Sequence, residues 1–233
     1  MRVAVVADIH GNLPALEAVL AEVERERPDH IVSCGDVAAG PMPTETIERL
    51  RALPNARFVR GNADVLEDWA AEQVSDEQRD FLAGFQDTVT VEIDGLGGVL
   101  FCHGSPRSDV EVMLVDTPEE RMRELLDGVD ANVVVCGHTH MPFDRVVEGV
   151  RVVNPGSVGM PYGEPGAHWA MLGPGVDMRR TDYDRNVAAA RIKASTWPRA
   201  EEFASGNVLE VPSLEEAMAY MRDYDLKQRS GAR

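Results

Sequence analysis

Two histidines one residue apart end an apolar run in the stretch VVVCGHTHMP, residues 133–142. A single histidine at a strand end is usually a hydrogen-bonded structural residue, whereas a pair can contribute to a metal site. Four other short polar motifs also follow apolar runs. In chain order these are Asp8-Ile9-His10, Gly35-Asp36, Gly61-Asn62 and His103-Gly104.

Together the motifs offer two carboxylates, four imidazoles and one carboxamide, but no thiolate. This set suits a divalent ion, for which we expect manganese, with iron, zinc, nickel or cobalt as alternatives. Seven donors are too many for one tetrahedral ion, but they match the number that two ions sharing a carboxylate would use. The candidate metal ligands are Asp8, His10, Asp36, Asn62, His103, His138 and His140.

The segments before the motifs predict an α/β protein. Residues 3–7 form an apolar run typical of a buried strand, and apolar side chains at helical spacing follow from residue 13, with Asn12 as a plausible N-cap. A similar order of strand, loop and helix recurs over residues 30–59 and predicts βαβ units. Carboxyl ends of strands in such a sheet meet at one edge, so the fold can gather motifs that are distant in sequence.

Hairpins and then helices are expected in the second half. The pairs DG at residues 94–95 and EG at 148–149 favour tight turns between apolar strands, and residues 168–181 predict a closing antiparallel pair. The pattern becomes helical from about residue 184. We therefore divide the chain into a core, residues 1–183, and a helical appendage, residues 184–233, which packs on the core and covers part of the site.

Composition excludes several classes of protein. The 233 residues are enough for one large domain, and a net charge of −17 without a basic stripe disfavours general nucleic-acid binding. No apolar run is long enough for a signal peptide or a membrane span. Three cysteines without disulfide-type spacing agree with a cytoplasmic location. The sequence leaves open whether the chain forms a homo-oligomer.

With the five motifs in this order, residues 1–180 resemble the calcineurin-like metallophosphoesterases, specifically their small bacterial and archaeal branch. The resemblance implies a four-layer α/β/β/α sandwich that holds two metal ions. It implies that one ion is bound by Asp8, His10, Asp36 and His140, and the other by Asp36, Asn62, His103 and His138.

The family mechanism is attack on phosphorus by a hydroxide held between the two ions. We therefore expect hydrolysis of a small phosphodiester or phosphomonoester, with nucleotides and cyclic nucleotides as plausible substrates. We take Asp36, Asn62 and His103 as the catalytic residues of the set. The alternative is a metal-binding scaffold or regulatory protein on the same fold, although scaffold relatives typically lack some of the ligands.

One position departs from the family pattern. Many relatives have a histidine after the Gly-Asn motif, which can protonate the leaving group, whereas this chain has Ala63. Asp64 follows, but it lacks the adjacent imidazole that is its usual partner. We therefore expect a preference for good leaving groups, or a substitute acid such as His168.

Several neighbouring residues have an ordinary structural interpretation that we favour. The three cysteines, each beside a motif, fit buried packing positions better than thiolate ligands. Arg60 and Arg107 could grip a phosphate, but arginines at loop ends are usually solvated or ion-paired. In the loop around residues 154–162, we expect structural support for the site rather than substrate contact by Ser157 or Tyr162.

Overall fold

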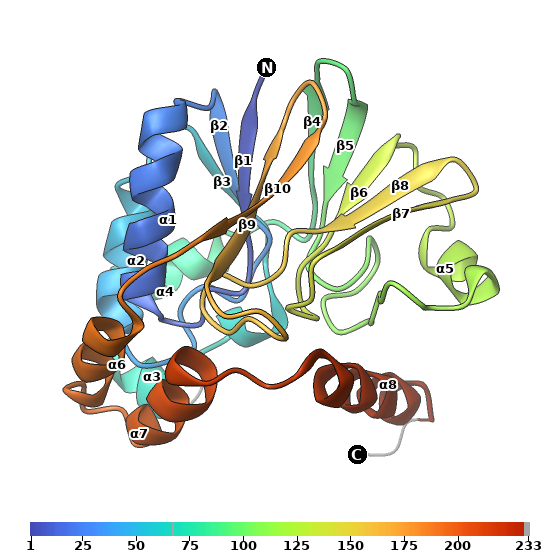
Figure 1. The fold of residues 1–233 in the computed structure, drawn as a ribbon. Coiled ribbons are helices and arrows are strands. Elements are labelled where there is room, and N and C mark those ends of the chain that lie inside the picture. Colours follow the sequence, from blue (N-terminus) through green and yellow to red (C-terminus); the bar gives the residue numbers. More distant parts are fainter. Residues whose placement is uncertain (67, 231–233) are drawn as a thin grey trace.

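The computed structural model describes residues 1–66 and 68–230. Two five-stranded sheets form the centre of the protein (Figure 1). The strand order in the first sheet is β10 (Val176–Thr181), β9 (Ala167–Leu172), β1 (Val3–Val6), β2 (His30–Ser33) and β3 (Ala56–Phe58). In the second sheet it is β4 (Val89–Ile93), β5 (Gly97–Phe101), β6 (Val133–Val135), β8 (Val150–Asn154) and β7 (Phe143–Val147).

Each sheet combines three adjacent parallel strands with two antiparallel pairings, and in the first sheet β9 pairs antiparallel with both β1 and β10. In the first sheet β1 pairs parallel with β2, and β2 with β3. In the second sheet β5, β6 and β8 are parallel, while the predicted hairpins β4–β5 and β7–β8 are antiparallel. The inward faces of the two sheets share one apolar core, in which Val5 and Val32 of the first sheet pack with Phe101 and Val135 of the second.

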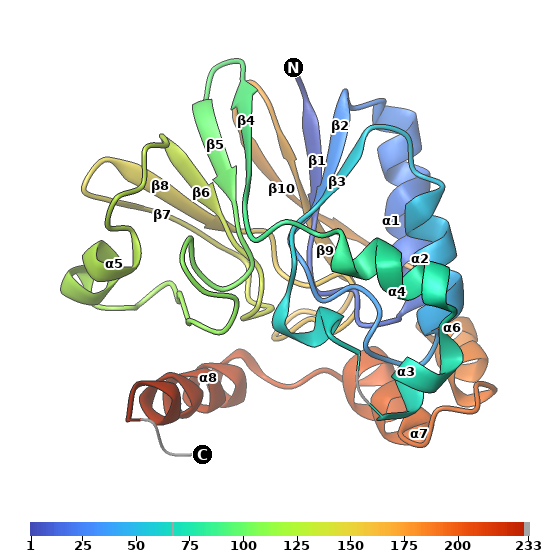
Figure 2. The same cartoon turned by 180° about the vertical axis from the view of Figure 1, so that it is seen from behind.

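Helices cover the outer faces of both sheets, as Figures 1 and 2 show from opposite sides. On the first sheet lie α1 (Leu13–Glu26), α2 (Pro43–Arg51) and α4 (Asp76–Ala83), with α3 (Asp68–Gln73) nearby, and on the second lies α5 (Glu119–Leu125). Asn12 caps α1 as predicted, because its side chain accepts a hydrogen bond from the amide of Ala15. The predicted four-layer α/β/β/α sandwich is therefore confirmed.

The described chain after Asp184 is mostly helical, as expected. It forms α6 (Arg185–Lys193), α7 (Ala200–Phe203), a π-helical turn η2 (Ala204–Leu209) and α8 (Leu214–Ser230). The first three pack together around Ile192 and Phe203, whereas α8 lies apart from them, below the strand ends (Figures 1 and 2). The boundary between a core and an appendage at residues 183 and 184 remains a prediction.

No helix in the described part of the chain is long and apolar enough to span a membrane.

Candidate metal centre

All five motifs lie in loops that leave the carboxyl ends of parallel strands. The two sheets bring these ends to the same side of the molecule, at the bottom of Figure 1. The backbone amide of His138, from the second sheet, donates hydrogen bonds of 3.1 Å to both carboxylate oxygens of Asp8, from the first. Asp8 and His10 follow β1, Asp36 follows β2, Asn62 follows β3, His103 follows β5, and His138 and His140 follow β6.

A continuous series of short distances joins the predicted ligands. His138 adjoins the series, with its ring centroid 5.1 Å from that of His103. All seven side chains are thus brought into one cluster. Nε2 of His103 lies 3.1 Å from Asn62 Oδ1 and 3.4 Å from Asp36 Oδ2. The same Asp36 oxygen lies 3.6 Å from His10 Nε2. Nε2 of His140 lies 3.2 Å from His10 Nε2 and 3.5 Å from Asp8 Oδ1.

Asp36 has the central place in this series. Its Oδ2 lies between the Nε2 atoms of His10 and His103, which the family pattern assigns to different ions. Its Oδ1 is occupied instead by the backbone amide of Ala63, at 2.7 Å. Asp8 is also close to both groups, since it lies within 4.8 Å of ligand atoms in each. We favour Asp36 as the shared ligand, because a single oxygen atom of this residue faces both histidines.

Five of the predicted ligands have a left-handed backbone conformation, which the sequence motifs did not reveal. The φ angles are 54° for Asp8, 47° for His10, 53° for Asp36, 67° for His138 and 60° for His140. Non-glycine residues rarely adopt this region, and each such residue carries a strain of about 1 kcal/mol or more. Strain of this kind is concentrated at functional sites, where the surrounding structure maintains it.

Two glycines of the motifs are required by close approach. A Cβ atom on Gly61 would lie 2.2 Å from Oδ1 of Asp36. A Cβ atom on Gly35, which has φ +92°, would lie 2.7 Å from Nδ1 of His103. Any side chain at these positions would displace a predicted ligand, which explains why glycine precedes both Asp36 and Asn62.

Backbone carbonyls orient the histidine rings. Nδ1 of His103 lies 2.6 Å from the carbonyl oxygen of Cys34, and Nδ1 of His140 lies 2.8 Å from that of Met160. An Nδ1–H that donates to a carbonyl leaves Nε2 as the ligand atom and fixes the ring. These contacts are typical of the second layer of interactions around a bound metal.

Three of the four imidazoles are held neutral, as metal binding requires. Burial lowers the pKa of His138 to about 3, and burial followed by the effect of His10 lowers the pKa of His140. Burial also lowers the pKa of His10, although Asp36 acts in the opposite direction.

His103 behaves differently from the other three. Burial would lower its pKa, but the adjacent Asp36 and then Asp8 outweigh this and raise the pKa to about 10. Burial would in turn raise the pKa of Asp36, yet His103 and His10 hold it well below the usual range. The cluster therefore contains an ionised carboxylate beside a protonated imidazole, and a cation bound there would take the place of that proton.

Two further observations show that the residues fit a metal ion. The Nε2 atom of His138 is buried and has no hydrogen-bond partner among the described residues. The Nε2 atoms of His10 and His140 lie only 3.2 Å apart. Two nitrogens that each lie about 2.1 Å from one cation are separated by roughly 3 Å. A cation would thus give the buried His138 nitrogen a partner, and the His10 and His140 nitrogens already have the spacing of two ligands of one cation.

Asp64 positions two of the loops that carry predicted ligands. It accepts hydrogen bonds from the backbone amides of Asp36, Val37 and Gly61, at 2.8–3.0 Å. Asp64 therefore holds the Asp36 and Asn62 loops together. Its sequence position beside the motif was the only signal of this role.

The loop at residues 154–157 supports the cluster from the other side. Asn154 Nδ2 donates to the carbonyl of Gly137, and its Oδ1 accepts from the amide of Gly156. Ser157 is fully buried, and its hydroxyl donates to the Asp8 carbonyl at 2.7 Å. These contacts agree with the expected supporting role and leave Ser157 without access to a substrate.

Other candidates are engaged elsewhere. His168, the suggested substitute acid, is buried on β9, and its Nε2 lies 2.9 Å from the carbonyl of Glu164. Arg107 forms a bidentate pair with Glu111, and Arg60 lies 3.4 Å from Asp87. The three cysteines are free and buried, as expected for packing positions. Burial raises the thiol pKa of each, which disfavours a thiolate ligand.

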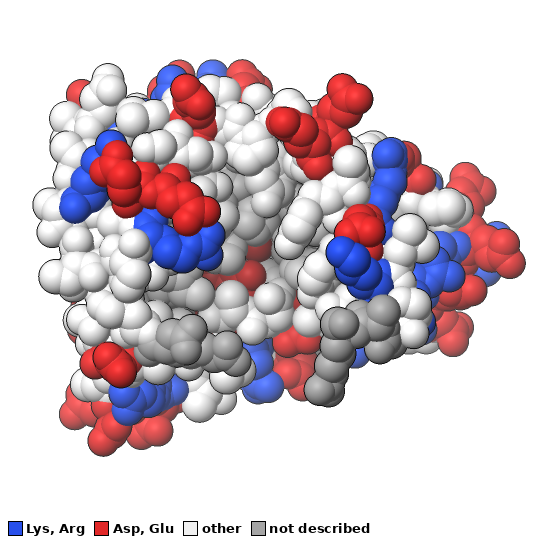
Figure 3. Space-filling model, turned by 90° about the horizontal axis from the view of Figure 1, so that it is seen from below, with Lys and Arg blue, Asp and Glu red and all other residues white. Residues whose placement is uncertain are grey.

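The cluster opens to solvent on the side of Asn62, which is exposed, and His10, which is partly exposed. Figure 3 views this end of the molecule, and the surface is hollowed at its centre with acidic atoms visible inside the hollow. A polar pocket of about 410 Å³ extends outward from His103 between Arg60 and Arg107. A small ester bound at the cluster could extend into this pocket.

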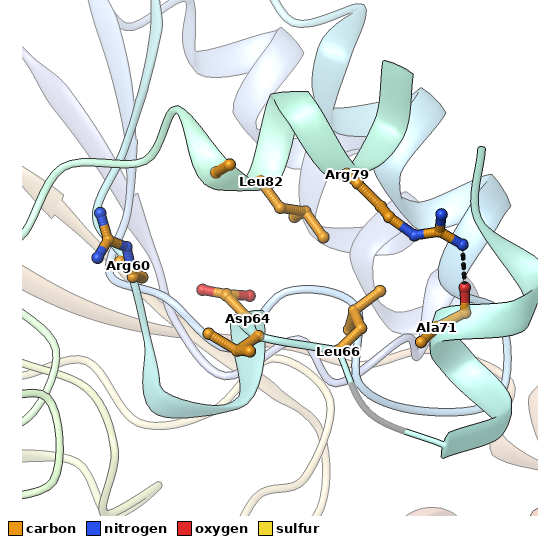
Figure 4. A pocket seen from close by; sticks show the side chains of 8 residues that line it. Arg60, Asp64, Leu66, Ala71, Arg79 and Leu82 are labelled. Carbon is orange, nitrogen blue, oxygen red and sulfur yellow. Dashed lines mark hydrogen bonds between the residues drawn. The ribbon is translucent and has the colours of Figure 1, made fainter. Parts of the chain in front are cut away.

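A second pocket, of about 390 Å³, lies between the Asp64 loop and helices α3 and α4 (Figure 4). Leu66, Ala71 and Leu82 give it a largely apolar lining, and Arg79 donates a hydrogen bond to the Ala71 carbonyl at its edge. None of the seven predicted ligands lines this pocket, so we do not assign it to the metal centre.

Comparison with known proteins identifies relatives of the whole arrangement. Residues 1–173, which include all five motifs, match the calcineurin-like phosphoesterase superfamily domain. The uncharacterized protein MJ0912 of Methanocaldococcus jannaschii is 27% identical over 235 residues, covering 84% of this chain and 93% of that protein. Phosphodiesterase MJ0936 of the same organism is 28% identical over 160 residues, covering 67% of this chain and 83% of that protein.

A solved structure extends the comparison. The metallophosphoesterase from Sphaerobacter thermophilus is 26% identical in sequence and superimposes with a TM-score of 0.71. The match covers 90% of this chain and 98% of that chain, so it includes part of the helical region after residue 184.

Proposed function

Because the chain belongs to the calcineurin-like phosphoesterase superfamily, we propose that it is a dinuclear metal-dependent phosphoesterase that hydrolyses a small phosphodiester or phosphomonoester. The observation that carries the proposal is the position of Asp36, whose Oδ2 lies 3.6 Å from His10 Nε2 and 3.4 Å from His103 Nε2. A carboxylate oxygen placed between two groups of ligands is suited to a pair of ions.

Asp8, His10 and His140 would hold one ion, and Asn62, His103 and His138 the other, with Asp36 shared. When bound, the ions supply an activated water and concentrated positive charge for a phosphate group. Manganese is our first choice for both sites, because the donors are oxygen and nitrogen atoms.

The protein's own groups would position the substrate. Asn62 is exposed at the mouth of the cluster, where its carboxamide can donate a hydrogen bond to a phosphoryl oxygen. The pocket beside His103 is lined by the hydroxyls of Ser105 and Ser108 and by Arg60 and Arg107, whose guanidinium groups are already paired with Asp87 and Glu111. This polar lining suits an ester with several hydrogen-bonding groups, such as a nucleotide or cyclic nucleotide.

The site lacks an evident proton donor for the leaving group among the described residues. Ala63 donates only its backbone amide, to Asp36, and its methyl group cannot deliver a proton. His168 is committed to the Glu164 carbonyl. We therefore propose that the enzyme acts best on esters whose leaving groups depart without protonation.

We place the protein in the cytoplasm, because its three cysteines are free and buried, as is usual in a reducing compartment.

The test is hydrolysis of bis(p-nitrophenyl) phosphate by the manganese-loaded protein. We expect measurable turnover that Asp36→Asn reduces by at least about a hundredfold, because the neutral amide lacks the negative charge that the carboxylate would share between two ions. Asp127→Asn, which makes the same chemical change at an exposed position, is the control and should keep the parent rate. A protein that binds manganese but hydrolyses no ester would instead be a metal-binding scaffold.

A further inference from the structure

Two tyrosines lie against two of the predicted ligand histidines. The ring of Tyr162 is stacked on that of His140, with centroids 5.2 Å apart and an interplanar angle of 19°. The ring of Tyr224 meets that of His138 at 61°, with centroids 5.7 Å apart. His138 and His140 belong to different ions in the family pattern, so each ion would have an aromatic side chain close to it.

Tyr224 reaches this position because α8 packs beneath the ligand loops (Figures 1 and 2). Ala217 and Met221 of α8 are buried in an apolar cluster that includes Val112, Leu114 and Met141. Met141 directly follows the ligand His140, so the helix is attached to the ligand loop itself.

Polar contacts hold the two ends of this arrangement. The amide of Gly163 donates to the carbonyl of Pro212, just before α8, and Arg222 pairs with Asp116. The position of Tyr224 is therefore fixed by packing on one side of the helix and by hydrogen bonds at the linker and the surface.

The aromatic surface continues outward from the cluster. Tyr224 is only partly buried, and Tyr220, one turn earlier on α8, is 61% exposed. Their rings are nearly parallel, with centroids 6.5 Å apart and an angle of 27° between planes. We call this pair the tyrosine ledge. The i, i+4 spacing on α8 places the two rings side by side, and the ledge extends from a predicted ligand histidine into solvent.

We propose that Tyr224 is a specificity-determining residue, which favours phosphate esters that carry an aromatic ring over small alkyl esters. The inference rests on the proposed function, because it requires a phosphate group at the ion pair. A ring attached to that phosphate can pack on the tyrosine ledge, and contacts between aromatic rings prefer stacked or edge-to-face arrangements that the ledge offers. A nucleobase or a phenyl group has the necessary shape.

The experiment compares the binding of two phosphonates that cannot be hydrolysed, by titration calorimetry on the manganese-loaded protein. Methylphosphonate tests the phosphate position alone, and phenylphosphonate adds the ring. One aromatic contact is worth about a three- to tenfold change in affinity. We therefore expect the parent to bind phenylphosphonate about three- to tenfold more tightly, and Tyr224→Ala to bind the two probes almost equally.

Two further variants separate the ring from other effects. Tyr224→Phe keeps the ring and should keep the preference. Leu226→Ala shortens an apolar side chain that is 62% exposed on the same helix, and it should also keep the preference.

Three outcomes would overturn the inference. They are equal affinities in the parent, an unchanged ratio in Tyr224→Ala, or a loss of methylphosphonate binding in Tyr224→Ala, which would show that Tyr224 only supports His138. If the parent failed to bind methylphosphonate at all, the proposed function would fail together with the inference.

Discussion

Asn154 should be one of the most sensitive positions outside the predicted metal ligands. Its side chain is fully buried and makes three hydrogen bonds. Nδ2 donates to the carbonyl of Gly137 at 2.7 Å and to the hydroxyl of Thr139 at 3.1 Å, while Oδ1 accepts from the amide of Gly156 at 2.8 Å. Gly137 and Thr139 flank His138, so Asn154 holds the loop that presents two predicted ligands.

The effect of Asn154→Ala can be estimated from these contacts. The buried Gly156 amide would lose its acceptor, at about 1–3 kcal/mol, whereas the Gly137 carbonyl would lose one of its two donors and keep the Thr139 amide, at about 1 kcal/mol. With the weaker contact to Thr139, we expect the free energy of unfolding to fall by about 3 kcal/mol. For a chain of this length that corresponds to a fall of roughly 6–12 °C in melting temperature.

The assay is thermal unfolding of chelator-treated protein, so that metal binding does not contribute. Asn154→Asp keeps the size of the side chain but places a carboxylate oxygen against the Gly137 carbonyl, so we expect an equal or larger loss at neutral pH. Asn186→Ala, at an exposed position in α6, is the control and should change the free energy of unfolding by less than about 0.5 kcal/mol. A melting temperature for Asn154→Ala within 1 or 2 °C of the parent would refute this reasoning.

Two further predictions concern catalysis and pH. Ala63→His should restore a proton donor beside Asn62 and raise the rate on an alkyl-leaving phosphomonoester by about tenfold or more relative to a nitrophenyl ester, and an unchanged ratio of the two rates would contradict the explanation of Ala63. Hydrogen bonds from Arg2 and then Arg179 lower the pKa of Glu26 to about 2 from its usual 4.5. A lowered pKa stabilises the folded protein above pH 4.5, and this contribution is lost as the pH falls toward 2. Glu26→Gln should therefore lower the melting temperature at pH 7 but have little effect near pH 2, whereas a difference independent of pH would argue against the ion pairs.

The cluster of ligands could be predicted from the sequence because each motif follows an apolar run. Such runs become buried strands, and parallel strands bring their carboxyl ends to one edge. This rule was enough to predict that Asp36 and His103 lie close together, although they follow strands of different sheets. The helices could also be predicted, since apolar periodicity and the Asn12 cap indicated α1.

The supporting layer could not be predicted in the same way. Asn154 and Ser157 act through hydrogen bonds to Gly137 and Asp8, and no periodic pattern indicates a contact between residues so distant in sequence. The left-handed backbone of the ligands was also unexpected, because aspartate and histidine ordinarily avoid φ angles that suit glycine. The sequence predicted a helical appendage that covers part of the site, but it did not indicate which loops α8 contacts, because that depends on the packing of Met221 against residues distant in sequence.

The central claim is that five loops form one site for two ions joined by Asp36. The most direct measurement is X-ray diffraction from crystals grown with manganese, at a wavelength where manganese scatters anomalously. We predict two anomalous peaks in each chain, about 3.5–4 Å apart, with Asp36 in contact with both and His103 in contact with one. A single peak, or two peaks that Asp36 does not join, would contradict the claim.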